Sequence, residues 1–256
     1  MRGTNAAAIY VLWLREMKRY RRSKARIAST LALPFLFLVG FWYGFGTVRF
    51  PGATGGVSYL QFLVPGIVGM TMLFSASFGG ISVIFDRQFG FLKEILVTPV
   101  DRVSIALGRV AGSTTTAVIQ GVLILILSIG IGFRPVSWLG LLPALGFMIL
   151  IGATFIGLGL AVASRIDDFQ AFNLLFNFVL FPLLFLSGAI YPVANFPTPI
   201  RYVTYVNPLT YGVDGLRGVL VGASMFPPLV DFVVVAGFAL AFVVVGAYAF
   251  EGTDAV

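Results

Sequence analysis

The sequence predicts an all-α integral membrane protein, and composition and the placement of charge are the two observations behind this fold class. Hydrophobic residues make up 59% of the 256 residues, and charged residues only 11%. Soluble domains carry about 25% charged residues, and a chain of this size has too little interior to hide so much apolar surface. A water-soluble enzyme or binding domain is therefore excluded. A disordered chain is excluded as well, since it needs low hydrophobicity and high charge.

Six long windows contain no Lys, Arg, Asp or Glu. They are residues 27–48, 50–85, 110–133, 135–164, 169–200 and 232–250. A helix needs about 20 mostly apolar residues to cross the hydrocarbon core, so each window has room for one span. Backbone that faces lipid must satisfy its own hydrogen bonds, and the windows lack the alternation of barrel strands. We therefore expect six transmembrane helices in a single domain, 1–256.

The distribution of basic residues predicts the orientation. Six spans place both termini on one side of the membrane, and cytoplasmic loops are the richer in Lys and Arg. With a cytoplasmic N-terminus, 13 basic residues lie inside and 4 outside. We therefore expect a multi-pass protein of the plasma membrane with both termini in the cytoplasm. The net charge of +7 then reflects topology, and no nucleic-acid partner is expected.

Residues 1–26 predict an amphipathic helix at the membrane surface. The apolar side of a helical wheel consists of Ile9, Trp13, Met17 and Tyr20. The basic side consists of Arg15, Lys18, Arg19, Arg22 and Arg26. Glu16 and Lys24 break this pattern. Such a helix lies flat at the interface and attracts anionic lipid, so membrane lipid is an expected partner. The alternative is a solvated tail that only sets topology, and the region lacks the pattern of a secretory signal peptide.

The sequence lacks the residues that several kinds of function require. There is no cysteine for disulfides and no histidine, and the windows hold only neutral polar groups such as Gln120, Asn173 and Asn177. Proton-coupled carriers place ionisable groups inside their spans, so proton coupling is not expected, whereas sodium coupling stays open. No lysine follows a glycine run as in a Walker A loop. We expect no catalytic, cofactor or metal site, and an energy source on another chain.

The segment 86–104, between the second and third expected spans, predicts a short amphipathic helix. Its apolar side consists of Phe89, Phe91, Leu92, Ile95 and Leu96, and its polar side of Arg87, Lys93 and Glu94. Pro99, after Thr98, ends the helix because the residue before a proline disfavours the α conformation. The helix could dock into a groove of a cytoplasmic partner or pack on the bundle as a loop. These residues leave both readings open.

Two further segments carry packing and gating hypotheses. The run Gly108–Gly112 at the start of the third span has the small-xxx-small pattern of close helix packing. The segment 188–228 is apolar but rich in proline, which predicts two short helices, 198–206 and 209–222, in a re-entrant outer position. Asp214 and Arg217 lie three residues apart on the second of these helices. They either neutralise each other or belong to an outer gate.

Two motifs give the chain a family resemblance. The first consists of Asp86, Arg87, Gly90, Leu92, Glu94, Leu96, Thr98 and Pro99, followed by Gly108 and Arg109. The second consists of Phe181, Pro182, 185–188, Pro192, 207–211, Asp214, Leu216 and Arg217. With these motifs the chain resembles the membrane component of ABC-2-type transporters, specifically the daunorubicin-resistance and nodulation-factor exporter permeases. One departure is Phe-Leu-Lys-Glu at 91–94, where many relatives have Thr-Leu-Glu; the choice of partner could therefore differ.

The resemblance implies the rest of a transporter. Such permeases pair with a second copy or a homologous permease, and bind two copies of a cytoplasmic ATPase that holds ATP and Mg. The segment after the second span would be the coupling helix, with Arg87, Phe89, Gly90, Phe91, Leu92, Lys93, Glu94, Leu96, Thr98 and Pro99 as its contact residues. The outer gate candidates would be Asn207, Pro208, Tyr211, Asp214 and Arg217. The expected cargo is an amphiphilic drug-like, lipidic or glycolipid molecule, with polysaccharide as a further candidate. A self-sufficient carrier or channel is the alternative function.

Overall fold

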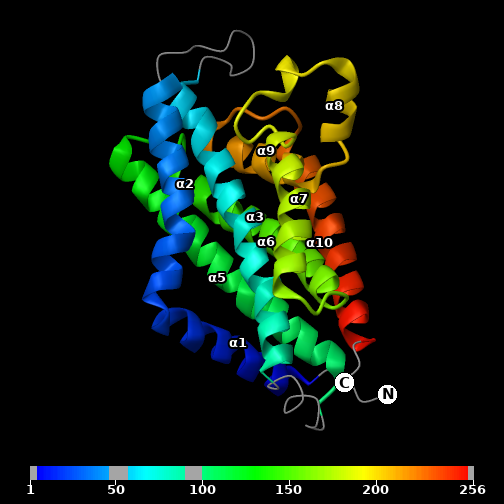
Figure 1. Cartoon of the computed structure of the whole chain (residues 1–256). Coiled ribbons are helices and arrows are strands. Elements are labelled where there is room, and N and C mark those ends of the chain that lie inside the picture. The colour runs from blue at the N-terminus through cyan, green and yellow to red at the C-terminus, as the bar shows by residue number, and fades with distance from the viewer. Residues whose placement is uncertain (1–4, 46–56, 90–99, 253–256) are drawn as a thin grey trace.

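The computed structural model describes residues 5–45, 57–89 and 100–252, and every regular element within these ranges is a helix (Figure 1). The α-helices are α1 (Ala6–Arg22), α2 (Lys24–Phe45), α3 (Tyr59–Gln88), α5 (Arg102–Ile131), α6 (Leu141–Ala163), α7 (Phe169–Phe185), α8 (Thr198–Thr204), α9 (Pro208–Val221) and α10 (Pro228–Glu251). Two short 3₁₀ helices cover Trp138–Gly140 and Val193–Asn195. The all-α fold class is thus confirmed for the described part of the chain.

Five of the described helices are long and apolar enough to cross a membrane, namely α2, α3, α5, α6 and α10. They overlap five of the six charge-free windows and extend past several of them. In the sixth window lies α7, which is apolar but has 17 residues. At 1.5 Å per residue it is about 26 Å long, slightly less than the ~30 Å hydrocarbon core. The chain is therefore a multi-pass membrane protein, while the sixth span stays a prediction.

The bundle is built around α3. Of its membrane-span window, 78% is buried, against 11% for α2 at the edge. Helices α2, α5, α6, α7 and α9 all pack against α3, and α10 packs on the far side of α6. The α6–α10 contact is close because two glycines meet there: a Cβ on Gly246 would lie 2.6 Å from the carbonyl oxygen of Gly157. Without a hydrophobic force between helices in lipid, such close packing of small residues holds spans together.

The two ends of the bundle carry different short helices. At one end, α1 runs across the bundle at a steep angle to α2, from which only Ser23 separates it (Figure 1). At the opposite end lie α8 and α9, at the places predicted for two short helices. We call these the α1 end and the α9 end. Asn207 caps α9 by accepting the Leu209 N–H, and Pro208 occupies the first helical position, where its missing N–H costs nothing.

Helix α5 begins earlier than its charge-free window suggests. The window starts at residue 110, but the helix starts at Arg102, with Asp101 at its N-cap. Arg109 therefore lies inside the helix and is buried. A charge can occupy this position only if a partner compensates it, because an unpaired buried guanidinium is costly. Because α5 begins at Arg102, the expectation that the Gly108–Gly112 run opens the helix was wrong.

Candidate functional site

Helix α1 packs closely on α5, and glycine makes this approach possible. A Cβ on Gly108 would lie 2.9 Å from the Leu12 Cβ and 3.2 Å from the Ile9 carbonyl oxygen. One turn further along, a Cβ on Gly112 would lie 2.8 Å from the Glu16 Cβ. The small-xxx-small prediction is confirmed, and the partner is α1. Packing of this kind fixes the position of α1 along α5.

Two polar contacts lock α1 in the same place. The indole Nε1 of Trp13 donates to the Thr115 hydroxyl at 3.0 Å. The backbone N–H of Asn5 donates to the Ser104 hydroxyl at 2.9 Å. The sequence predicts Trp13 on an apolar face; the ring is half-buried and directed at α5. A Trp ring that is apolar at one end and a donor at the other suits this contact.

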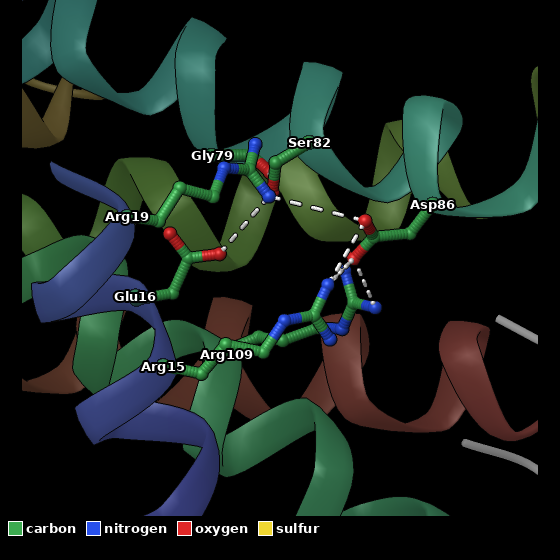
Figure 2. Close-up of polar contacts among 7 residues, drawn as sticks. All are labelled: Arg15, Glu16, Arg19, Gly79, Ser82, Asp86 and Arg109. Carbon is green, nitrogen blue, oxygen red and sulfur yellow. Dashed lines mark hydrogen bonds and ion pairs between the residues drawn. The ribbon is translucent and has the colours of Figure 1, made fainter. Parts of the chain in front are cut away.

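Asp86, near the end of α3, accepts hydrogen bonds from two arginines on two different helices. Arg109 of α5 donates from Nη2 to Oδ2 at 2.8 Å, and Arg15 of α1 donates from Nη2 to both oxygens at 3.1 Å. Arg19 lies 3.9 Å away, as an ion pair. Figure 2 shows the three guanidinium groups converging on this one carboxylate. Charge-assisted bonds of this kind are the stronger class of protein hydrogen bond.

Glu16 completes the group, which we call the Asp86 cluster: Arg15, Glu16, Arg19, Asp86 and Arg109. The Glu16 carboxylate pairs with Arg19 at 3.5 Å and is buried (Figure 2). Ser82, one turn before Asp86, donates to the carbonyl of Gly79 in its own helix and does not compete for the arginines. The cluster thus holds three guanidinium groups and two carboxylates, an excess of one positive charge.

Arg109 depends on Asp86 more than the α1 arginines do. The side chains of Arg109 and Asp86 are buried to a similar degree, with 6% and 7% of their surface exposed. Within the described residues, the Nε and Nη1 atoms of Arg109 have no hydrogen-bond partner. The guanidinium also lies 5.8 Å from the centroid of the Phe250 ring of α10. Removing the carboxylate would leave a buried charge uncompensated, which is strongly destabilising.

The cluster lies where the chain enters and leaves the predicted coupling segment. Asp86 is two residues before the last residue of α3, and Arg109 is in the second turn of α5. Arg15 and Arg19 bond α1 directly to Asp86 of α3, and Arg109 of α5 joins them through the same carboxylate. The cluster therefore joins both flanks of the segment to each other and to α1.

Two predicted coupling residues fall within the described residues. Arg87 forms an ion pair with Asp167 and donates to the Ser164 carbonyl, so the end of α3 is tied to the loop before α7. Phe89 has 71% of its surface exposed and stacks on Phe85. Arg87 is thus occupied within the chain, whereas the Phe89 ring is free to contact a partner. The other predicted residues lie outside the described residues: Gly90, Phe91, Leu92, Lys93, Glu94, Leu96, Thr98 and Pro99.

The residues predicted for the interfacial helix divide differently from the helical wheel. Lys18 and Arg22 are exposed and Met17 is half-buried, as a surface helix requires. Arg15 and Arg19, expected on the outward basic side, reach inward to Asp86 instead. Glu16, which breaks the wheel pattern, is buried because it pairs with Arg19. A helical wheel describes one helix only, so it cannot show that Arg15 has a partner, Asp86, 71 residues later in the chain.

A second polar junction lies at the α9 end, around the pair Asp214 and Arg217, which we call the α9 ion pair. Their charged atoms lie 3.8 Å apart and both side chains are buried. Arg217 stacks on the Phe62 ring, 3.9 Å from its centroid, and donates to the carbonyl of Gly188 at 3.0 Å. Burial lowers the pKa of Arg217 to about 10 and Asp214 opposes the shift, so the guanidinium is charged at neutral pH.

Asp214 is not free to neutralise Arg217 alone. Its carboxylate accepts the backbone N–H groups of Met225 at 2.7 Å and Phe226 at 2.9 Å. The pair therefore ties the loop before α10 to the start of α3 and the turn after α7. The other outer gate candidates are also bonded: Asn207 donates to the Leu183 carbonyl at 2.6 Å and the Tyr211 hydroxyl to the Tyr205 carbonyl at 2.8 Å. These bonds connect α9 to the neighbouring loops, and the outer gate stays a prediction.

A cavity of about 540 Å³ lies beside the α9 ion pair. Its polar lining comes from Ser187, Thr210, Asp214, Arg217 and Ser224, and its apolar lining includes Phe62 and Val221. The Thr210 hydroxyl is buried and has no partner among the described residues. The volume is within the range of small-molecule pockets, and the lining suits a molecule with both polar and apolar parts.

Comparisons with known proteins agree with this architecture. Residues 7–221 match the family model "ABC-2 type transporter". Nodulation protein J of Rhizobium leguminosarum bv. trifolii is 31% identical over 223 residues, which cover 86% of this chain and 82% of the relative. Inner membrane transport permease YadH of Escherichia coli (strain K12) is 28% identical over 239 residues, 92% of this chain and 91% of the relative. The chain therefore belongs to the ABC-2 type transporter family, as a membrane-spanning permease component.

Proposed function

We propose that this chain is the permease subunit of an ATP-driven exporter, and that it forms the translocation pathway as a dimer coupled to two copies of a separate cytoplasmic ATPase. The observation that carries the proposal is the Asp86 cluster. It bonds both flanks of the segment 90–99 to each other and to α1. A push on that segment would therefore move α3, α5 and α1 together, which is what coupling to an ATPase requires.

In this proposal, the orientation in the membrane follows from the position of the Asp86 cluster at the α1 end. The α1 end carries most of the basic residues and lies in the cytoplasm, in accord with the positive-inside rule. The α9 end then faces outward, and α7 is the sixth span, around which the bilayer thins locally because the helix is slightly shorter than the hydrocarbon core. The exposed ring of Phe89 provides the first apolar contact for an ATPase groove.

An amphiphilic molecule is the proposed cargo class. The spans hold few charges, and the cavity beside the α9 ion pair combines hydroxyl and charged groups with apolar walls. A polar head would contact Thr210 and Ser224 there, while the apolar part stays against aliphatic and aromatic side chains. The cavity lies at the outward end, so it would hold the cargo shortly before release.

Two measurements test the proposal. The tagged permease is purified from its native host, and co-purifying proteins are identified by mass spectrometry; an ABC ATPase is expected. In reconstituted vesicles with that ATPase, Phe91→Asp or Leu92→Asp is expected to abolish permease-stimulated ATP hydrolysis. Val136→Asp, on an exposed residue near the α9 end, is the control and is expected to behave as the parent.

The alternative function makes the opposite prediction. A self-sufficient carrier or channel would transport in vesicles without an ATPase, and coupling-segment variants would then transport normally. Normal transport with normal stimulation of ATP hydrolysis in Leu92→Asp would overturn the docking role. The dimer is tested separately, by the mass of the purified permease in detergent.

A further inference from the structure

The surface of α1 contains a groove with a strongly basic lining. Its volume is about 680 Å³, and its charged lining consists of Arg15, Lys18, Arg19 and Arg22. Val11 and Leu14 form the apolar part. Among the residues that the structure describes, no Asp or Glu lines it. We call this the α1 groove. Four cations around one hollow repel each other unless an anion occupies it or solvent screens them.

The cations are not neutralised by the carboxylates nearby. Arg15 and Arg19 share Asp86 and Glu16 with Arg109, so the Asp86 cluster has one cation too many. Lys18 and Arg22 form no ion pair among the described residues, and both are exposed. Arg15 and Arg19 are about one third exposed, so their guanidinium groups are accessible from the groove while they contact Asp86. The groove thus has an uncompensated charge and accessible donors.

The groove also selects the kind of anion. Arginine forks match the oxygens of a phosphate, and lysine adds a point charge. Val11, exposed beside these cations, would contact an apolar group attached to the anion. A phosphate joined to acyl chains meets both demands, and an amphipathic helix that crosses the end of a membrane bundle lies where such molecules are concentrated.

We propose that the α1 groove binds the phosphate of an anionic phospholipid, and that Arg15 and Arg19 are shared between this phosphate and Asp86. The inference rests on the proposed function in one respect, the location of α1 at the membrane surface. An occupied groove draws these two guanidinium groups outward, which weakens the bond between α1 and α3. Asp86 keeps its bond to Arg109, so the junction between α3 and α5 persists. The lipid thereby sets how tightly α1 follows the coupling segment.

The test measures lipid binding directly and needs neither transport nor an ATPase. The purified permease is titrated with phosphatidylglycerol or phosphatidylcholine in detergent, and bound lipid is counted by native mass spectrometry. The double variant Lys18→Gln/Arg22→Gln removes two groove cations that do not touch Asp86. With each basic residue near a membrane surface contributing about 1 kcal/mol, phosphatidylglycerol is expected to bind roughly 30-fold more weakly. Arg21→Gln is the matched control, an exposed arginine of α1 outside the groove, and is expected to bind as the parent.

Several outcomes would overturn the proposal. Equal binding of phosphatidylglycerol and phosphatidylcholine, or equal losses in Arg21→Gln and the double variant, would remove the site. Displacement of the lipid by millimolar inorganic phosphate would identify a free phosphate as the ligand instead. If lipid binding is unchanged but the double variant loses an ATPase partner, the groove is a protein contact. If the parent binds the lipid selectively but no ATPase is found, the proposed function fails and the lipid site stands.

A second variant tests the sharing of arginines. Asp86→Asn alone would leave Arg109 buried without a carboxylate, so Asp86→Asn/Arg109→Gln is the safer change. It releases Arg15 and Arg19 to the groove, and tighter phosphatidylglycerol binding than in the parent is expected. Unchanged binding in a variant that elutes as a folded species would overturn the sharing while leaving the site itself intact.

Discussion

Arg109 donates a 2.8 Å hydrogen bond to Asp86, and both side chains are buried where α3 and α5 approach each other. This bond closes the chain on either side of the segment 90–99. Asp86→Ala is expected to destabilise the protein by about 3–5 kcal/mol, because a buried guanidinium loses its carboxylate. The measurement is thermal stability in detergent by size exclusion. The double variant Asp86→Ala/Arg109→Met is expected to be more stable than Asp86→Ala, and the reverse order would contradict the buried pair.

Gly108→Leu is expected to push α1 away from α5. Even a Cβ there would lie within 3.2 Å of the Ile9 backbone, which cannot rotate out of the way. The readout is fluorescence of Trp13, which loses its hydrogen bond to Thr115, in a background with the other two tryptophans replaced by Phe. Gly130→Leu, on the same helix, has open space at its Cβ and is the control. An unchanged Trp13 spectrum in Gly108→Leu would argue against this packing.

Arg217→Lys is expected to lower thermal stability although the charge is kept. Lysine cannot stack on the Phe62 ring while donating to the carbonyls of Phe62 and Gly188, as the guanidinium does. We expect a loss of about 2 kcal/mol, the size of one desolvated cation–π contact plus unpaired carbonyls. Arg134→Lys is the control, since Arg134 is exposed and its bonds to the carbonyls of Ile129, in the last turn of α5, and of Phe133 are long. Equal stability of the two variants would refute the role of Arg217.

Phe89→Ala and Phe85→Ala are expected to separate coupling from stability. Phe89 is mostly exposed, so its removal should leave thermal stability unchanged and weaken stimulation of ATP hydrolysis by the permease. Phe85 stacks on Phe169 as well as on Phe89, so its removal should lower stability. Both quantities are measured on the same preparations. A loss of stability in Phe89→Ala with normal stimulation would mean that the ring packs on its own chain.

The sequence predicts the helices better than it predicts their polar contacts. The charge-free windows locate five spans, and the prolines locate α8 and α9, because both signals are local in the sequence. The Gly108–Gly112 pattern predicts a close contact but does not name α1 as the partner. The inward direction of Arg15 and Arg19 depends on Asp86, and the burial of Glu16 depends on its contact with Gly112. Neither could be predicted, because both partners lie far away in the sequence. One residue in the sequence does point to such a contact: Glu16 is an acid within a basic helix, which indicates that its carboxylate has a specific partner.

Helix α3 connects the two junctions. Near one end, the ring and carbonyl of Phe62 are held by Arg217, and near the other, Asp86 is held by the arginines. About 36 Å of helix separates these residues, and its hydrogen bonds resist compression along the axis. Pro65, which has no N–H for the Gln61 carbonyl, introduces one compliant turn close to Phe62. If the proposed coupling holds, a displacement of Asp86 along the axis would be transmitted through α3 to the turn at Pro65, and the contacts of Arg217 with Phe62 are those that this movement would have to break.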